Sequence, residues 1–252
     1  MFDAVVLAGG GKREPLTEQE GVNNKAFIKI YGREILAYIL ESLEKAPSIN
    51  RIVVVGPEDD LRQLQKDGYR FDLALEQGSM LNNIAAGLEK TEQGKLSLIV
   101  TGDIPLLTDA VVERFIKSCS PHQCDLYYPV IRKSSFEKGL PGSVRTYVRL
   151  LEGQVTGGNI GLVSPAWFFA NRNRLEMFIA YRKKPVKLAR ILSPVLVLKF
   201  LFKRLSISDL ESFLSRLLNL KACAVISEDI EIGVDVDKVS DLSLIKEALK
   251  PD

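Results

Sequence analysis

The chain has few of the residues that build disulfide-rich, zinc or histidine-based sites. Its 252 residues include only three cysteines, one histidine and one tryptophan. Three cysteines in a chain of this length argue against a disulfide framework and are typical of a reducing cytosol. His122 is the single candidate base for a catalytic triad, and no G-x-S-x-G motif accompanies it. Cys119, His122 and Cys124 lie close together, but no second ligand pair completes a zinc site, so we expect a surface loop there.

Long apolar runs and an excess of one charge are also missing. No uninterrupted apolar stretch approaches the roughly 20 residues of a membrane-spanning helix. The N-terminus lacks the basic segment and cleavage site of a signal peptide. Lys and Arg total 34 against 32 Asp and Glu, so there is no overall basic field for nucleic acid. We therefore expect a cytoplasmic protein that binds no nucleic acid and depends on local sites.

Strand-like and helix-like segments alternate in the first half of the chain. Short apolar runs predict strands, and apolar residues at helical spacing predict the helices between them. The predicted strands are 4–8, 52–55 and 98–101, and the predicted helices are 34–45, 59–66, 81–90 and 108–119. This alternation favours right-handed crossovers and an α/β fold with a mostly parallel sheet and helices on both faces.

The second half of the chain has a different pattern. It predicts strands at 127–131, 146–150, 159–163, 223–226 and 230–234, a loop at 134–143 and a closing helix at 240–249. Residues 166–220 are mostly helical in pattern. Because strand-like sequence resumes after them, we interpret 1–252 as a single domain with a helical insertion at 166–220.

Three glycines and two cations follow the first predicted strand. Gly9, Gly10 and Gly11 let backbone N–H groups approach an anion without obstruction by Cβ, and Lys12 and Arg13 add positive charge. The third glycine of a dinucleotide fingerprint and the spacing of a P-loop are both absent. The segment therefore predicts a phosphate-binding loop of another kind; the alternative is a tight turn between a strand and a helix.

Carboxylates occur where two apolar segments end. Asp103 follows the strand 98–101, which places it at the carboxyl edge of the sheet, where ligands bind in open α/β folds. Asp235 and Asp237 are two residues apart on an extended segment, so both can face one side. One or two carboxylates suffice for Mg²⁺ when substrate phosphates supply the rest. The alternatives are a turn before Pro105 for Asp103 and a solvated strand end for the other two.

Four segments in order resemble the nucleotidyltransferases related to molybdenum-cofactor guanylyltransferase, the MobA-like NTP transferases. They are Leu7-Ala8-Gly9-Gly10 with Arg13, then Asn24-Lys25-Ala26-Phe27-Ile28 and Gly32-Arg33-Glu34-Ile35-Leu36; residues 100–107 around Asp103; Gly157-Gly158-Asn159-Ile160-Gly161; and residues 232–237 with Asp241-Leu242. Residues 9–17 also resemble the loop of sugar-phosphate nucleotidyltransferases. The resemblance covers about 1–165 and 222–249, and 166–220 has no counterpart in the smaller relatives.

The resemblance implies a three-layer nucleotide-binding fold like that of nucleotide-diphospho-sugar transferases. It implies Mg²⁺-dependent (alternatively Mn²⁺-dependent) transfer of a nucleoside monophosphate from a nucleoside triphosphate, with GTP or CTP favoured, to a phosphorylated or cofactor-like small molecule, with release of pyrophosphate. The implied residues are Arg13, Lys25 and Asp103 for catalysis; Leu7, Ala8, Gly9, Gly10, Gly11, Lys12, Gly78, Ser79 and Asn82 for the nucleotide; Gly158 and Asn159 for the acceptor; and Asp103 with Asp235 or Asp237 for the metal. For Ser79, an ordinary helix N-cap is an equal alternative.

Other functions stay open at this point. A sugar-phosphate nucleotidyltransferase fits the same loop. A glycosyltransferase could use Asp235-Val236-Asp237 as a D-x-D metal motif, but it would not need the loop at 9–13. A non-catalytic, membrane-docking nucleotide-binding protein would not need Asp103 or Lys25.

The segment 183–204 combines cations with an apolar stripe. Its seven cations are Lys183, Lys184, Lys187, Arg190, Lys199, Lys203 and Arg204, and Leu188, Ile191, Leu192, Val195 and Leu196 follow helical spacing. Such a stripe packs on its own domain or on a second subunit of a homodimer. The alternative is peripheral contact with acidic lipid, or a site for an apolar acceptor.

Overall fold

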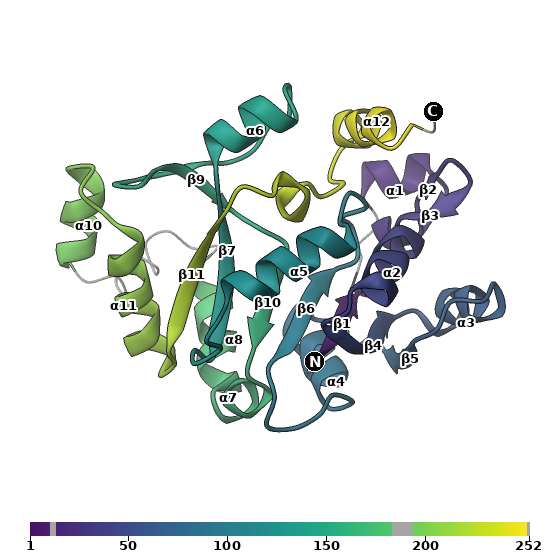
Figure 1. Cartoon of the computed structure of the whole chain (residues 1–252), viewed down its shortest axis with the longest axis horizontal. Helices are drawn as coiled ribbons and strands as arrows, with labels where there is room; N and C mark the ends of the chain where they lie inside the picture. The colour runs from purple at the N-terminus through teal and green to yellow at the C-terminus, as the bar shows by residue number, and fades with distance from the viewer. Residues whose placement is uncertain (11–13, 183–193, 251–252) are drawn as a thin grey trace.

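A mixed β-sheet of nine strands forms the centre of the molecule (Figure 1). The computed structural model describes residues 1–10, 14–182 and 194–250. The strands are β1 (Phe2–Leu7), β4 (Ile49–Gly56), β5 (Asp72–Leu75), β6 (Ser97–Thr101), β7 (Leu126–Arg132), β8 (Val148–Leu150), β9 (Gly153–Gly157), β10 (Ile160–Val163) and β11 (Ala222–Ser227). Their order is β5-β4-β1-β6-β10-β7-β9-β8, with β11 beside β7. The pairs among β5, β4, β1 and β6 are parallel, whereas β10 runs antiparallel to β6 and β7. The predicted α/β fold with a mostly parallel sheet is confirmed.

Apolar side chains on both faces of the sheet attach the helices. In β1, Ala4 and Val6 belong to one buried cluster, while Val5 between them belongs to another. This alternation gives a parallel strand two buried faces and explains its continuous apolar sequence. The first cluster contains α2 (Ile35–Lys45), α5 (Asp109–Ser118) and α12 (Val239–Ala248). The second contains α4 (Met80–Leu88), α7 (Pro165–Ala170) and the end of α11 (Ile207–Leu218).

The remaining elements include two corrections to the predicted pattern. They are α1 (Pro15–Gln19), η1 (Lys25–Phe27), β2 (Lys29–Ile30), β3 (Arg33–Glu34), α3 (Glu58–Lys66), α6 (Lys133–Gly139), α8 (Arg172–Arg182), α10 (Pro194–Leu201) and η2 (Ile230–Gly233). The predicted loop at 134–143 is wrong over α6, where Phe136 packs into the core. The predicted strand at 230–234 is also wrong, because this apolar segment forms the 3₁₀-helix η2 after β11 has ended.

Along the chain, the helices α7, α8, α10 and α11 follow β10 and precede β11, and these two strands belong to the same sheet. Figure 1 shows α10 and α11 at the end of the molecule opposite α3. A third buried cluster joins α10 and α11 to the hairpin of β8 and β9 through Leu150, Val155, Leu196, Leu205 and Phe213. Of the segment singled out at 183–204, residues 183–193 lie outside the described residues. No helix within the described ranges has the length and apolarity to cross a bilayer.

The cysteines differ from expectation. Cys124 and Cys223 form a disulfide, although they are 99 residues apart in sequence. The pairing of β11 with β7 brings them together, because Cys223 lies opposite Tyr127 in the register. The sequence argued only against a disulfide framework, and it gave no sign of this single pair, because no local pattern shows that β11 lies beside β7. The predicted surface loop is confirmed between α5 and β7, where Ser120, Pro121 and Gln123 are exposed, but the Cys119 and Cys124 side chains at its ends are buried.

Candidate active site

A cavity of about 410 Å³ opens where β1 and β6 end at the carboxyl edge of the sheet. It is lined by Leu7, Gly9, Gly10, Glu14, Thr17, Asn24, Lys25, Met80, Thr101, Gly102 and Asp103. The cavity therefore brings together the glycine loop, the Asn24–Lys25 segment and the strand-end carboxylate. Gly11, Lys12 and Arg13 lie outside the described residues.

Two glycines keep the loop close to its neighbours. A Cβ on Gly102 would lie 2.8 Å from the Leu7 carbonyl oxygen, which is backbone and cannot move aside cheaply. Gly10 has a φ of +85°, a left-handed conformation that favours glycine. Its N–H donates to the carboxylate of Glu76 at 2.6 Å. The loop thus presents a backbone N–H to an anionic group, and sequence reasoning missed Glu76 because it lies 66 residues away.

Lys25 connects the glycine loop to the carboxylates. Asn24 caps the short helix η1 and also donates from its amide to the Ala8 carbonyl oxygen at 2.9 Å. This positions Lys25 Nζ 2.5 Å from Asp237 Oδ1 and 3.0 Å from Glu14 Oε2. Partial burial by itself lowers the pKa of Lys25, but the hydrogen bonds with Asp237 and Glu14 raise it above its ordinary value. The ammonium therefore stays charged at every physiological pH.

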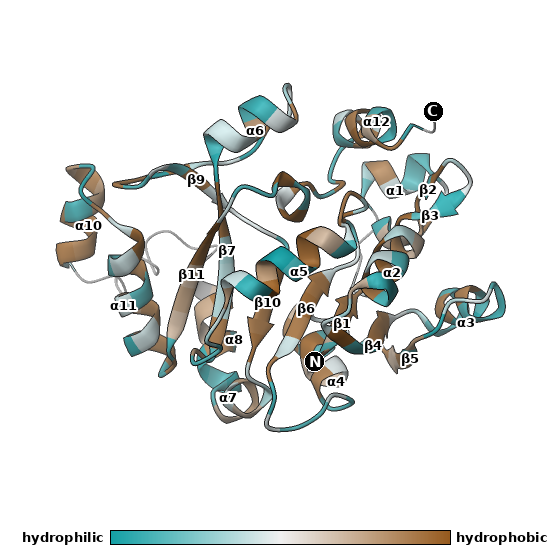
Figure 2. Ribbon diagram, in the orientation of Figure 1, coloured by the Kyte–Doolittle hydropathy of each residue, from teal (hydrophilic) through white to brown (hydrophobic). Residues whose placement is uncertain are grey.

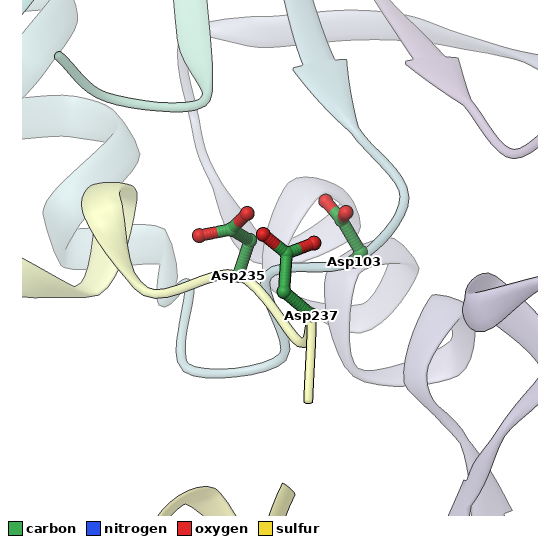
Figure 3. A group of neighbouring side chains, drawn as sticks. All are labelled: Asp103, Asp235 and Asp237. Carbon is green, nitrogen blue, oxygen red and sulfur yellow. The ribbon is translucent and has the colours of Figure 1, made fainter. Parts of the chain in front are cut away.

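Three carboxylates meet beside the cavity. Asp103, Asp235 and Asp237 each offer an oxygen that lies within 4.8 Å of the other two. Figure 3 shows Asp237 between the other two in the view, with Asp103 coming from the turn after β6. The backbone fixes this arrangement, since the Val236 N–H donates to the Asp103 carbonyl oxygen at 3.0 Å. The cluster includes both carboxylates that the sequence offered as alternatives.

The protonation behaviour of the cluster reflects crowded negative charge. Burial, reinforced by the Asp235 carboxylate, raises the pKa of Asp103 to about 6. Burial also raises the pKa of Asp235. For Asp237, burial is the largest single influence and raises the pKa, but the hydrogen bond and charge of Lys25, together with Asp235 and Arg145, outweigh it and lower the pKa below its ordinary value. Asp103 Oδ1 is buried without a hydrogen-bond partner. An orphaned carboxylate oxygen in an oxygen-only cluster fits a hard divalent cation such as Mg²⁺.

A second cavity, of about 350 Å³, lies on the other side of the carboxylates. It is lined by Val144, Arg145, Thr146, Thr156, Gly157, Asn159, Gly233, Asp235, Asp237, Lys238, Ser240 and Asp241. Of the two residues expected at the acceptor, Asn159 lines this cavity and Gly158 does not. A Cβ on Gly158 would lie 3.1 Å from the Ile232 carbonyl oxygen, so Gly158 serves close backbone packing. Sequence reasoning missed Arg145, which forms an ion pair with Asp235.

The segment expected near the nucleobase lies at the start of α4. Ser79 is the N-cap of this helix, and its hydroxyl accepts from the Asn82 N–H. The Asn82 side chain accepts from Arg172 on α8 at 2.7 Å. Gly78, Ser79 and Asn82 do not line the glycine-loop cavity; Met80, from the same segment, does.

Comparison with known proteins gives the family. Residues 4–206 match the family described as MobA-like NTP transferase domain. A hypothetical transferase from Thermus thermophilus has 34% sequence identity and a TM-score of 0.83 over 96% of this chain and 100% of that one. The family match therefore extends through residue 206, well into the helical stretch 166–220, and this structure covers most of the same stretch.

Two curated relatives match a shorter part. A probable molybdenum cofactor guanylyltransferase from Thermococcus gammatolerans is 31% identical over 47% of this chain and 58% of its own length. A 2-C-methyl-D-erythritol 4-phosphate cytidylyltransferase from Clostridium kluyveri is 30% identical over 46% of this chain and 51% of its own. The chain therefore spans about half the length of the curated relatives it matches. Since the family match extends over most of the sequence, this chain belongs to the MobA-like NTP transferase family of nucleotidyltransferases.

Proposed function

We propose that this protein transfers a nucleoside monophosphate from a nucleoside triphosphate to a small phosphorylated acceptor. The observation that carries the proposal is the position of the three carboxylates between two cavities. One cavity has the glycine loop and Lys25, which suit a triphosphate. The other has Arg145, Lys238 and Asn159, which suit a smaller anionic molecule.

In the proposed reaction, a phosphate oxygen of the acceptor attacks the α-phosphorus of the triphosphate. The bond from that phosphorus to the oxygen bridging the β-phosphate breaks, and pyrophosphate leaves with the electron pair. The chain contributes position and charge, since no covalent intermediate is required. The ammonium of Lys25 and backbone N–H groups of the glycine loop would hold the phosphates, with the Gly10 N–H exchanging Glu76 for a phosphate oxygen. Asp103, with Asp235 and Asp237, would hold a divalent cation, which neutralises negative charge on the reacting phosphates when bound.

The finer assignments belong to the same proposal. GTP and CTP are the favoured donors, because the matched relatives are named as a guanylyltransferase and a cytidylyltransferase. Gly11, Lys12 and Arg13, which lie outside the described residues, are proposed to bind the phosphates with Gly9 and Gly10. Gly78, Ser79 and Asn82 lie on the segment proposed for the base. Mg²⁺ is the proposed cation, with Mn²⁺ as a substitute.

A glycosyltransferase that uses a nucleotide-sugar donor is the alternative for the same carboxylates. The glycine loop argues against it, because a nucleotide-sugar has no triphosphate for Gly9, Gly10 and Lys25 to hold. The family match also favours nucleotidyl transfer.

Ligand-dependent stabilisation tests the proposal directly. The four nucleoside triphosphates are added separately, with Mg²⁺ or with EDTA, and the midpoint of thermal unfolding is measured. We expect one nucleotide, GTP or CTP, to raise the midpoint with Mg²⁺ by more than its monophosphate does. Pyrophosphate release with a panel of phosphorylated acceptors then identifies the second substrate. Equal, metal-independent shifts for all four nucleotides would contradict the proposal.

We further propose that the described part of 183–204 makes peripheral contact with an anionic membrane. On and after α10, Val195, Leu198, Phe200, Leu201 and Phe202 are each at least half exposed. Lys203 and Arg204 follow them, are exposed, and form no ion pair with any described residue. Exposed aromatic and apolar side chains beside unpaired cations suit the surface of an acidic bilayer. A cytoplasmic protein with reversible membrane contact is the corresponding proposal for its location.

A further inference from the structure

Arg145 is held in the candidate acceptor cavity by Asp235, one of the carboxylates of the proposed cation site. It lies between α6 and β8, and its guanidinium pairs with Asp235 through Nη1, while Nη2 donates to the Asp235 carbonyl oxygen at 3.3 Å. The side chains of Arg145 and Asp235 are only 12% and 19% exposed. The ion pair is therefore shielded from solvent and is not an ordinary surface contact.

The contact leaves Arg145 incompletely satisfied. Its Nε is buried and has no hydrogen-bond partner. A guanidinium has five N–H donors in a planar fork, which suits the two-point recognition of a phosphate. Arg145 lines the cavity together with Thr156, Asn159 and Lys238, so further polar groups surround the same space. The cavity thus has the donors for an anion, but Asp235, Asp237 and Asp241 also line it, so a cation at the carboxylates is needed before its charge favours an anion.

Two of the three carboxylates are paired with cations, one from each cavity. Lys25 pairs with Asp237 from the glycine-loop cavity, and Arg145 pairs with Asp235 from the other. Asp103 has no cation in an ion pair among the described residues. A divalent cation at the cluster would compete with Arg145 for the Asp235 carboxylate and would repel the guanidinium.

We propose that Arg145 is the anion-binding residue for the acceptor and that divalent-cation binding at the carboxylates releases it for this role. The inference rests on the proposed function, because it assigns the second cavity to a phosphorylated acceptor. It orders the two substrates, since the cation, with its nucleotide, frees the group that binds the acceptor. It also makes the acceptor's phosphate a requirement for tight binding in this cavity.

The test measures Mn²⁺ and inorganic phosphate binding separately by calorimetry on the full chain, without turnover. Arg145→Ala removes the competitor for Asp235, so Mn²⁺ should bind roughly 10- to 100-fold more tightly. With saturating Mg²⁺, the same variant should bind phosphate more weakly by the same order. Arg145→Lys keeps the charge without the fork and should give intermediate values in both titrations. Arg149→Ala is the matched control: Arg149 is exposed on β8, has no ion pair with a described residue, and should behave as wild type.

In Arg145→Ala, tighter Mn²⁺ binding together with weaker phosphate binding distinguishes this role from a purely structural one, which would not change the two affinities in opposite directions. Unchanged or weaker Mn²⁺ binding in a folded Arg145→Ala protein would contradict the proposed release of Arg145 by the cation. The proposed nucleotidyl transfer would not be affected by that result. Loss of phosphate binding in Lys25→Ala but not in Arg145→Ala would place the anion in the glycine-loop cavity and overturn the assignment. If Arg145→Ala fails to fold, Arg145→Lys gives the Mn²⁺ comparison. Absence of Mn²⁺ binding from every variant would remove both the inference and the proposed function.

Discussion

Asp103, proposed as a ligand of the cation, also destabilises the folded chain when it is ionised. Because the pKa of Asp103 is raised to about 6 in the folded chain, its stabilising contribution is present below pH 4 and is lost as pH rises through 6. Asp103→Asn removes that loss, so the metal-free variant should be about 1–3 kcal/mol more stable than wild type at pH 7.5. Denaturant unfolding in EDTA measures the difference.

The stability difference between Asp103→Asn and wild type should depend on both pH and Mg²⁺. At pH 5 the stability difference between Asp103→Asn and wild type should shrink, because the wild-type carboxyl is then mostly protonated. With Mg²⁺ at pH 7.5, wild type should gain stability and the variant should not. Nucleotidyl transfer should be abolished in the variant. Near-normal turnover would remove Asp103 from the mechanism.

Lys25 is predicted to act on the phosphates beyond the α position. Lys25→Ala should weaken nucleoside triphosphate binding more than monophosphate binding, by about 1.5–3 kcal/mol or one to two decades. The loss also frees Asp237, which lies 2.5 Å from the ammonium. Metal binding without nucleotide should therefore tighten in the same variant. Calorimetry with GTP, CTP and their monophosphates checks the ratio, and equal losses would place Lys25 in another role.

At the scale of single elements, α10 has one buried and one exposed apolar side. Leu196 packs against Phe213 and the β8–β9 hairpin, whereas Leu201 and Phe202 are 66% and 71% exposed. Figure 2 shows brown, apolar ribbon on α10 at the edge of the molecule. We predict binding to vesicles of acidic phospholipid at low salt, because each nearby cation contributes about 1 kcal/mol.

Acidic substitutions at the exposed end of α10 distinguish binding to a membrane from binding to a second subunit. Leu201→Glu with Phe202→Glu should abolish vesicle flotation, and high salt should weaken it in wild type. Leu75→Glu, an exposed apolar position at the opposite edge of the sheet, is the matched control. No flotation of wild type, together with a dimer that the double variant dissociates, would instead assign the surface to a homodimer.

At the scale of the whole molecule, Trp167 reports how the helical stretch is joined to the sheet. This single tryptophan is buried on α7, and its indole N–H donates to the carbonyl oxygens of Leu218 and Asn219 at the end of α11. If 1–252 is one cooperative unit, Trp167 fluorescence and far-UV circular dichroism should follow the same urea transition. An earlier fluorescence transition would show that these helices unfold separately and would contradict the single-domain prediction.

The amino-acid sequence by itself determined the elements with a strong local signal. The alternation of apolar strands and amphipathic helices predicts the α/β fold, because hydrophobic period and burial are coupled locally. The position of Asp103 follows from the strand before it, since strand ends in a parallel sheet share one edge. The local pattern was misleading at η2, where alternating Ile230 and Ile232 suit a strand that has no partner.

Only the tertiary structure decided which distant groups meet. The Val236 N–H bonds to the Asp103 carbonyl, and this places Asp235 and Asp237 beside a strand that ends 134 residues earlier, at Thr101. Glu76 reaches Gly10, and Arg145 reaches Asp235, across 66 and 90 residues. No local period encodes these contacts, because they depend on strand order and on how the chain crosses the sheet edge. The sequence therefore predicts the chemical groups of the site, and the packing of the chain decides which of them are paired.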